Sequence, residues 1–368
     1  MERKTRVLAV NPGSTSTKIA LFEEYDELFG ITISHPAEQL KRFGSIQDQL
    51  EYRRDAVERT MAEKGCPMAE VDVFSARGGS LYPAAGGTYR VTELVVDHAS
   101  RGLHGEHPAQ LASQICFAFA SKFDKQAFIV NPPDCDELQD ISRITGLRGV
   151  YREGHIHVLN QKEIAIRFCK ARGNKYEDVN LVIAHLGGGI SVTAHQKGLM
   201  IDSNDIIKGS GPMTPTRAGD LPYAAVIDMA FSGEYTKKQL MDRLNRAGGL
   251  TDHFGTADAR DVVKMIEAGD KYAEIVAQGM AYQNAKYIGA MAVAMKGKVD
   301  AIILTGGISN NKYFTDIILD YVSWISEVVI MPGEFELEAL AAGALRVIHG
   351  EEEAKIYSGI PVWQGFEN

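Results

Sequence analysis

The stretch that decides the fold is Arg6-Val-Leu-Ala-Val-Asn-Pro-Gly-Ser-Thr-Ser-Thr-Lys-Ile-Ala-Leu-Phe22. Its apolar run from Arg6 to Val10 is typical of a β-strand, and the run from Lys18 to Phe22 is typical of a second one. Between them, Pro12 and Gly13 stand among small hydroxyl residues, which favours a tight turn. The segment therefore predicts a β-hairpin.

A similar segment opens the second half of the chain. Leu181-Val-Ile-Ala184 reads as a strand that runs into a glycine turn at Gly187-Gly-Gly189, followed by a returning strand. When Asn11 is superposed on His185, Gly13 aligns with the first glycine of that turn. The two halves thus share a strand, a small-residue turn and a second strand, which hints at an internal duplication.

The rest of the chain alternates between strand and helix patterns, so the sequence predicts an α/β fold. The expected strands also include residues 71–76, 127–130 and 301–304. The expected helices begin near Ile46 and Pro108, contain Leu240 and Leu244, span residues 271–296, and run from Leu337 to Ile348.

Composition limits the class of protein. The 368 residues, 45% hydrophobic and 24% charged, are enough for two domains with sizeable cores. The net charge of −9 and the lack of a long basic run argue against a nucleic-acid or anionic-membrane binder. No run approaches the ~18–20 apolar residues of a membrane span, and no secretory h-region follows the charged start. We therefore expect a cytoplasmic protein with no membrane or nucleic-acid partner.

Metal or redox motifs are not evident. The four cysteines contain no CxxC pair, and neither His104 with His107 nor His155 with His157 has further ligands at zinc spacing. Reduced thiols and no structural zinc site are expected.

The first turn, Asn11-Pro-Gly-Ser-Thr-Ser-Thr-Lys18, offers four hydroxyl groups, one lysine and unhindered backbone amides. Such donors suit the phosphates of a nucleotide, although an ordinary Ser/Thr-rich hairpin turn explains the same residues about as well. The density of donors favours phosphate binding. The turn is not a Walker A loop, and the chain has neither a GxGxxG nor a GxSxG motif.

Two more glycine turns follow apolar strands, His185-Leu-Gly-Gly-Gly-Ile-Ser191 and Leu304-Thr-Gly-Gly-Ile-Ser-Asn310. Three such turns at strand ends suit one nucleotide site at the edge of an α/β sheet. Arg77, beside a glycine pair, and Arg217, in a loop with prolines and glycines, could clamp a phosphoryl group.

His185 directly precedes its glycine turn, so it could hydrogen-bond a reacting group, although a half-buried structural histidine is an alternative. Carboxylates that could bind Mg²⁺ directly or through water are Asp136, Asp202 and Glu336. Spacing alone does not choose among them.

Together, Asn11-to-Lys18, His185-to-Gly189, Gly211-to-Gly219 and Pro332-Gly-Glu-Phe-Glu336 resemble the acetate and butyrate kinase family. The resemblance spans nearly the whole chain, and the butyrate or branched-chain branch looks closer. It implies duplicated ribonuclease-H-like domains of the sugar kinase, heat-shock chaperone and actin superfamily, with ATP in an interdomain cleft. The expected domains are residues 1–155 plus 337–368, and residues 156–336.

The resemblance also implies roles for individual residues. Catalysis would fall to a phosphoryl clamp of two arginines, two histidines and a carboxylate: Arg77, Arg217, His185, His157 and Glu336. Nucleotide binding would fall to the three turns: Asn11, Ser14, Ser16, Lys18, Gly187, Gly188, Gly189, Gly306, Gly307 and Asn311. Mg²⁺ would be held by Glu336 and Asp136, with Glu334 as an alternative to Glu336.

The implied activity is reversible phosphoryl transfer between ATP and butyrate or a branched short-chain fatty acid, giving an acyl phosphate and ADP, by at least a homodimer. The alternatives are an acetate or propionate kinase and a nucleotide-binding regulator that has lost catalysis. One departure motivates the regulator: Asn131-Pro132 stands where butyrate kinases usually have Asp-Pro. Asp134 or Asp136 would compensate for the missing charge.

Overall fold

The structure is a computed structural model of the chain and describes residues 3–103 and 105–366. It divides into two compact units, Met1–Asp136 with Phe335–Asn368, and Glu137–Glu334. The sequence places the first boundary after residue 155 and the last after residue 336. Those domain boundaries stay a prediction.

The first unit is built on a seven-stranded sheet with the order β12-β5-β6-β4-β1-β2-β3. Its strands are β1 (Arg6–Pro12), β2 (Ser16–Glu23), β3 (Asp26–Ser34), β4 (Val73–Ala76), β5 (Thr88–Arg90), β6 (Gln126–Val130) and β12 (Lys355–Ile356).

The predicted hairpin is confirmed, because β1 and β2 pair antiparallel with Asn11 opposite Lys18. On its other side β1 runs parallel to β4, and β4 runs parallel to β6. The carboxyl ends of β1, β4 and β6 therefore lie at one edge of the sheet, where ligands bind in α/β proteins.

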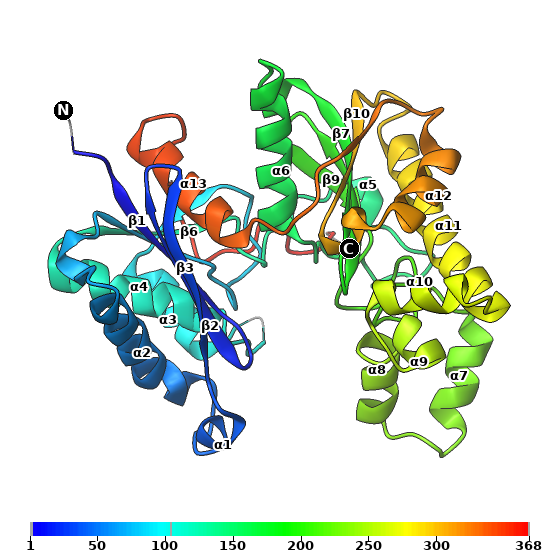
Figure 1. Cartoon of the computed structure of the whole chain (residues 1–368), viewed down its shortest axis with the longest axis horizontal. Helices are drawn as coiled ribbons and strands as arrows, with labels where there is room; N and C mark the ends of the chain where they lie inside the picture. The colour runs from blue at the N-terminus through cyan, green and yellow to red at the C-terminus, as the bar shows by residue number, and fades with distance from the viewer. Residues whose placement is uncertain (1–2, 104, 367–368) are drawn as a thin grey trace. The chain divides into compact units, whose positions relative to one another are not determined.

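Helices cover both faces of this sheet (Figure 1). Phe74 of β4 stacks on Phe119 of α4 with ring centroids 5.8 Å apart. The next residue, Ser75, points to the opposite face and donates to the carbonyl oxygen of Leu340 in α13 at 2.7 Å. The helices of the unit are α1 (Ala37–Leu40), α2 (Leu50–Glu63), α3 (Glu93–Arg101), α4 (Gln110–Phe123) and α13 (Glu336–Ile348), with 3-10 turns η1 (Gln47–Gln49) and η2 (Met68–Glu70).

The second unit contains a five-stranded sheet with the order β11-β10-β7-β8-β9. Here β7 pairs antiparallel with β8 and β8 with β9, whereas β10 runs parallel to both β7 and β11. This matches β6-β4-β1-β2-β3 of the first unit in both order and direction, so the expected duplication is confirmed at the level of topology. The strands are β7 (Asn180–Leu186), β8 (Ile190–Gln196), β9 (Leu199–Ser203), β10 (Ala301–Thr305) and β11 (Val328–Ile330).

Two helices sandwich this second sheet in Figure 1, α6 on one face and α11 on the other. Val182 and Ala184 of β7 belong to a core that includes Ala277 and Met280 of α11, while His185 reaches α6 on the other face. The helices of the unit are α5 (Asp140–Arg143), α6 (Val158–Ala171), α7 (Tyr223–Phe231), α8 (Lys237–Asn245), α9 (Leu250–Phe254), α10 (Ala259–Glu267), α11 (Lys271–Ala294) and α12 (Lys312–Val322), with 3-10 turns η3 (Tyr176–Asp178) and η4 (Gly307–Asn310).

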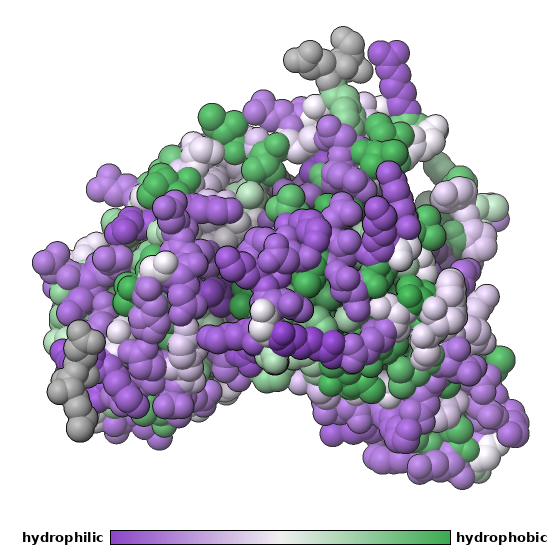
Figure 2. Space-filling view, turned by 90° about the horizontal axis from the view of Figure 1, so that it is seen from above, coloured by the Kyte–Doolittle hydropathy of each residue, from purple (hydrophilic) through white to green (hydrophobic). Residues whose placement is uncertain are grey.

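The surface agrees with the composition. On the face shown in Figure 2, hydrophilic residues are interspersed with hydrophobic patches, as is normal for a folded protein. Within residues 3–103 and 105–366, every helix is too short or too polar to cross a bilayer.

Candidate active site

In the first unit, three neighbouring parallel strands bring predicted residues to one sheet edge. Asn11 lies at the end of β1, Arg77 follows β4, and Asn131 follows β6. The backbone amide of Arg77 donates to the carbonyl oxygen of Val10 at 3.1 Å, so the backbone of Arg77 lies next to that of Asn11. The strand order thus explains why residues far apart in the sequence meet here.

The first glycine turn is held from inside by an arginine that sequence reasoning missed. Arg53 of α2 is fully buried and donates to the carbonyl oxygens of Gly13 at 2.9 Å, Ser16 at 3.0 Å and Ser14 at 3.2 Å. A buried guanidinium behind the turn fixes its shape and places positive charge close to any anion bound there. Its spacing could have indicated this role, because Arg53 lies four residues before Val57 and shares the buried face of the helix with it.

The predicted donors of the turn differ in exposure. Ser14 and Lys18 are exposed and Ser16 is half-buried, while the Gly13 amide donates to the Ser16 carbonyl oxygen at 2.7 Å. The lysine and the Ser14 hydroxyl are therefore open to a ligand.

Glu336 and Asn11 are brought together within this unit. Asn11 Nδ2 donates to Glu336 Oε2 at 2.8 Å, and Glu336 is the first residue of α13. Asp136 is 5% exposed, and its amide donates to the carbonyl oxygen of Ala84 at 3.0 Å. The described residues contain no group of three or more histidine, cysteine, aspartate or glutamate side chains placed to hold a metal, and His104 lies outside them.

The donor set nevertheless fits Mg²⁺ that arrives with a nucleotide. Glu336 supplies hard carboxylate oxygens beside Asn11, at the start of the first glycine turn, and protein-bound Mg²⁺ commonly uses one or two carboxylates together with substrate phosphates and water.

Asn131 has a role in the fold that the sequence did not reveal. It adopts a φ of 41°, a left-handed conformation that asparagine tolerates better than most residues. Its Oδ1 accepts a hydrogen bond from the Gly87 amide at 2.8 Å, and its own amide donates to the Gly87 carbonyl oxygen. The side chain is thus committed to the loop before β5.

In the second unit, too, the carboxyl ends of three neighbouring parallel strands lie at one sheet edge, here those of β7, β10 and β11. His185 pairs in register with Thr305 of β10, and Gly306 bridges to Gly333 after β11. Gly306 has a φ of 86°, and a Cβ there would lie 2.5 Å from the carbonyl oxygen of Leu186. Only glycine allows this close approach between the two strand ends.

The predicted adenosine-side residues lie around the following turn. Gly307 is exposed and begins η4, with no heavy atom within 4 Å of a Cβ placed on it. Asn311 caps α12, because its Oδ1 accepts from the Tyr313 amide at 3.1 Å. The asparagine therefore has a structural role at the start of α12, and its place on the adenosine side stays a prediction.

The two predicted histidines stack on each other. The rings of His157 and His185 have centroids 4.1 Å apart and an interplanar angle of 20°. His185 is 5% exposed, and burial lowers its pKa to about 4. A Cβ on Gly187 would lie 3.1 Å from His185 Nε2, so this nitrogen faces the second glycine turn.

Arg217 closes over the same turn. A Cβ on Gly189 would lie 2.8 Å from the guanidinium carbon of Arg217, so the guanidinium occupies the space that glycine leaves. The hydroxyls of Thr214 and Thr216 both donate to the Gly188 carbonyl oxygen, which ties the arginine loop to the glycine turn.

The guanidinium of Arg217 is partly buried, and two of its three nitrogens have no hydrogen-bond partner among the described residues. Nε and Nη1 of Arg217 are inaccessible to solvent and have no hydrogen-bond partner within the described part of the chain, and desolvation lowers the pKa of Arg217. Buried charged donors left unpaired are costly, so this arrangement indicates a site for an anion.

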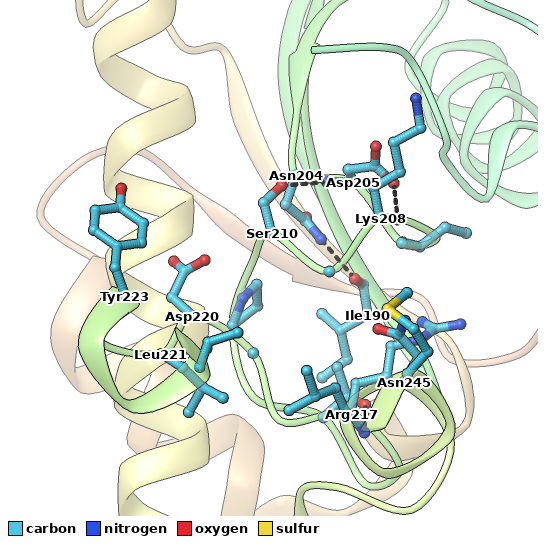
Figure 3. Close-up of a pocket in the computed structure, with 18 residues that line it drawn as sticks. Ile190, Asn204, Asp205, Lys208, Ser210, Arg217, Asp220, Leu221, Tyr223 and Asn245 are labelled. Carbon is cyan, nitrogen blue, oxygen red and sulfur yellow. Dashed lines mark hydrogen bonds between the residues drawn. The ribbon is translucent and has the colours of Figure 1, made fainter. Parts of the chain in front are cut away.

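A cavity of about 440 Å³ adjoins Arg217. Figure 3 shows Arg217, Ile190 and Asn245 on one side of it, with Leu221 and Tyr223 on the other. Much of the lining is apolar and comes from the start of β8, the loop after β9, α7 and α8: Ile190, Ile206, Pro212, Leu221, Val226, Met241 and Leu244. The cavity thus combines a cation with an apolar wall.

Comparison with known proteins agrees with this architecture. The family model described as the acetokinase family matches residues 143–323. An acetate kinase from Porphyromonas gingivalis is similar in structure, with a TM-score of 0.75 and 18% identity, covering 94% of this chain and 100% of that one.

A propionate kinase from Francisella tularensis subsp. tularensis SCHU S4 gives a TM-score of 0.72 and 16% identity, covering 92% of this chain and 98% of that one. A more distant match is the ROK hexokinase from Thermus thermophilus, with a TM-score of 0.50 and 14% identity, covering 94% of this chain and 100% of that one. The chain therefore has the fold of these acetate and propionate kinases.

Proposed function

We propose that the protein is a short-chain carboxylate kinase that transfers a phosphoryl group reversibly between ATP and butyrate or a branched short-chain fatty acid. The observation that carries the proposal is the half-buried guanidinium of Arg217, whose Nε and Nη1 lack hydrogen-bond partners among the described residues and which lies over the Gly187–Gly189 turn and beside a cavity with an apolar wall. A cation there can pair with a carboxylate or a transferring phosphoryl group, while the cavity takes an apolar tail.

The lining of the cavity supports a preference for butyrate or a branched short-chain fatty acid as the acyl substrate. Leu221, Val226, Met241 and Leu244 offer an apolar surface, and the volume of about 440 Å³ leaves room for a propyl or branched butyl group beside the guanidinium. Burying each extra methylene favours the longer substrate by about 0.8 kcal/mol. This supports a chain longer than that of acetate.

The nucleotide is assigned to the glycine turns. Lys18 and the Ser14 hydroxyl are open to its phosphates in the first unit, and Gly188 and Gly307 leave unobstructed backbone in the second. Backbone amides of such turns bind phosphate oxygens, and the absence of side chains permits close approach.

The reaction needs positioning more than it needs acid or base chemistry. The acceptor carboxylate is already anionic, so its attack on the γ-phosphorus requires no proton removal. Arg77 and Arg217 would neutralise the repulsion between acceptor and phosphoryl group and hold them in line. His157 and His185 would contact the equatorial oxygens on which negative charge spreads.

Mg²⁺ fits this scheme as part of the nucleotide substrate. Glu336, with Asn11 as its hydrogen-bond donor, would hold it, and Asp136 is the second predicted carboxylate. When bound, the ion would supply positive charge that offsets the negative charge of the phosphates.

The test is acyl-hydroxamate trapping with purified protein, Mg-ATP and a panel of straight and branched carboxylates of two to five carbons. We expect turnover to peak at four or five carbons. Arg217→Ala should lower turnover by about 10²-fold or more, since it removes charge stabilisation of the transition state. Arg246→Ala is the matched control, because that side chain is 82% exposed and pairs with Asp242, four residues earlier.

Near-normal turnover in Arg217→Ala would rule out the proposed site. A peak at acetate or propionate would favour the alternative that the similar solved structures suggest, an acetate or propionate kinase, and would leave the proposed chemistry intact.

The regulator alternative is tested by Asn131→Asp. Because Asn131 binds the Gly87 amide through Oδ1, which a carboxylate can also do, we expect both forms to be active. Activity only in the aspartate variant would instead mark a decayed enzyme. The proposal also includes a cytoplasmic homodimer or higher homo-oligomer, and sedimentation of the purified protein measures this assembly state.

A further inference from the structure

A buried hydrogen-bond chain leads to His157 in the second unit, and a separate hydrogen bond holds His185, the histidine stacked on it. The hydrogen-bond chain starts at Tyr176, whose hydroxyl lies 2.7 Å from His195 Nδ1, and continues from His195 Nε2 to Gln161 Oε1 at 2.8 Å. Gln161 then contacts Ser191, and Ser191 contacts His157. Asn160, the residue before Gln161 in α6, contacts His185.

The orientation of the Asn160 amide is fixed by two carbonyl groups. Asn160 Nδ2 lies 2.6 Å from the carbonyl oxygen of Glu334 and 3.2 Å from that of Gly333. Carbonyl oxygens only accept hydrogen bonds, so the amide nitrogen must face them and Oδ1 must face His185. His185 Nδ1, 2.8 Å from this Oδ1, therefore carries a hydrogen.

The Gln161 amide is fixed in the same way. Its Nε2 donates to the Ser191 carbonyl oxygen at 3.0 Å and to Ser191 Oγ at 2.7 Å. Ser191 Oγ also accepts from the His157 backbone amide at 3.4 Å. A hydroxyl has two acceptor sites and one hydrogen. The donations from Gln161 Nε2 and from the His157 amide therefore fill both acceptor sites of Ser191 Oγ.

The remaining hydrogen of Ser191 decides the state of His157. His157 Nδ1 lies 2.8 Å from Ser191 Oγ, and the only unassigned capacity of the hydroxyl is donation. Nδ1 of His157 is therefore an acceptor, and the neutral ring carries its hydrogen on Nε2.

We propose that Asn160 and Gln161 are positioning residues that fix opposite tautomers on the stacked pair, with the hydrogen on Nδ1 in His185 and on Nε2 in His157. Asn160 and Gln161 are 3% and 0% exposed, so solvent does not compete for these hydrogen bonds. Burial also keeps His185 neutral in the free protein, since it lowers the pKa to about 4.

The opposite tautomers give the two rings different roles, and this part rests on the proposed kinase function. His157 can donate from Nε2 to a phosphoryl oxygen while it is neutral. His185 presents a bare Nε2 toward the Gly187 turn and can donate from it only after taking up a proton there. That proton does not disturb the bond to Asn160, because Nδ1 keeps its own hydrogen.

The direct test is the long-range ¹H–¹⁵N correlation spectrum of the ligand-free protein with ¹⁵N-labelled histidine, near neutral pH. The hydrogen-bearing and bare ring nitrogens have well-separated ¹⁵N shifts, and His157→Gln and His185→Gln spectra assign the two rings. We expect a hydrogen on Nδ1 of His185 and on Nε2 of His157. A neutral His185 with its hydrogen on Nε2, or a neutral His157 with its hydrogen on Nδ1, would overturn the proposal.

Two variants separate positioning from packing. Gln161→Met keeps a similar shape but cannot donate to Ser191, so His157 should change to a mixture of tautomers while His185 keeps its state. Turnover should fall at least about tenfold with little change in the KM of ATP, as misplaced catalytic contacts require. Asn174→Asp, in the exposed turn after α6, is a control for amide replacement and should change neither ring.

Unchanged tautomers in Gln161→Met would refute the role of Gln161, whatever the activity. Because the spectra need no substrate, the native spectrum decides the tautomers even if a variant fails to fold. If trapping detects no acyl phosphate with the native protein, the proposed function fails while the tautomer assignment stands or falls on its own.

Discussion

The most specific perturbation of the candidate site leaves Arg217 in the sequence and moves only its guanidinium. In Gly189→Ala, the new Cβ would lie 2.8 Å from Arg217 Cζ and nearer still to Nη1. Ordinary van der Waals contact begins at 3.4 Å, so Cζ must retreat by at least 0.6 Å and Nη1 by more. The backbone of Gly189 does not have a left-handed φ, so alanine itself is tolerated there.

Such a displacement is of the size that impairs catalysis. A misplacement of about 1 Å costs roughly 100-fold in rate, or about 2.7 kcal/mol of activation free energy. Since the clash involves the far end of a flexible side chain, the fold should survive with little loss of thermal stability. We therefore expect turnover by acyl-hydroxamate trapping to fall by about two orders of magnitude.

A glycine outside the predicted nucleotide turns supplies the control. A Cβ on Gly279 of α11 has no heavy atom within 4 Å, so Gly279→Ala makes the same replacement without touching the arginine. If Gly189→Ala retains turnover similar to that of Gly279→Ala, the position of Arg217 over the turn does not matter and the reasoning fails.

Two further predictions concern stability. Gly343→Ala places a Cβ 2.8 Å from Cγ2 of Val130, so overpacking between α13 and β6 should cost about 1–3 kcal/mol in urea unfolding. A Cβ on Gly279 in α11 has no heavy atom within 4 Å, so Gly279→Ala should instead raise the free energy of unfolding by about 0.5–1 kcal/mol. Equal changes in unfolding free energy for the two variants would contradict the close packing at Gly343. Burial lowers the pKa of His185 and of His35 to about 4, from 6.5 in the unfolded chain. The unfolded state thus binds more protons between these values, so stability should be full above about pH 6.5 and fall toward pH 4, by up to about 1.4 kcal/mol per pH unit for each histidine. Constant stability from about pH 7 to pH 5 would show that neither histidine is held neutral.

Local patterns predicted the elements that carry the fold. The β1–β2 hairpin and the long helix α11 have clear periodic signals, and both are confirmed. Strand β3 was not predicted, although the sequence shows its alternating pattern. Phe29, Ile31 and Ile33 pack against the core, and the residues between them face solvent.

The site was predicted less completely, because its geometry depends on contacts between distant segments. The turns and arginines could be named, but nothing local places Arg217 in the space above Gly189. Arg53 shows the opposite case, since a charged residue on an apolar helix face was visible and was not interpreted. Asn131 was treated as a missing charge, whereas its hydrogen bond to Gly87 depends on a loop 44 residues away.

The central claim is direct phosphoryl transfer from ATP to a carboxylate, and ³¹P NMR of native protein with Mg-ATP and butyrate tests it most directly. The account predicts an acyl phosphate resonance that grows in step with ADP, with little inorganic phosphate in the early phase. Formation of ADP with inorganic phosphate alone, or no ADP with any carboxylate of two to five carbons, would contradict it.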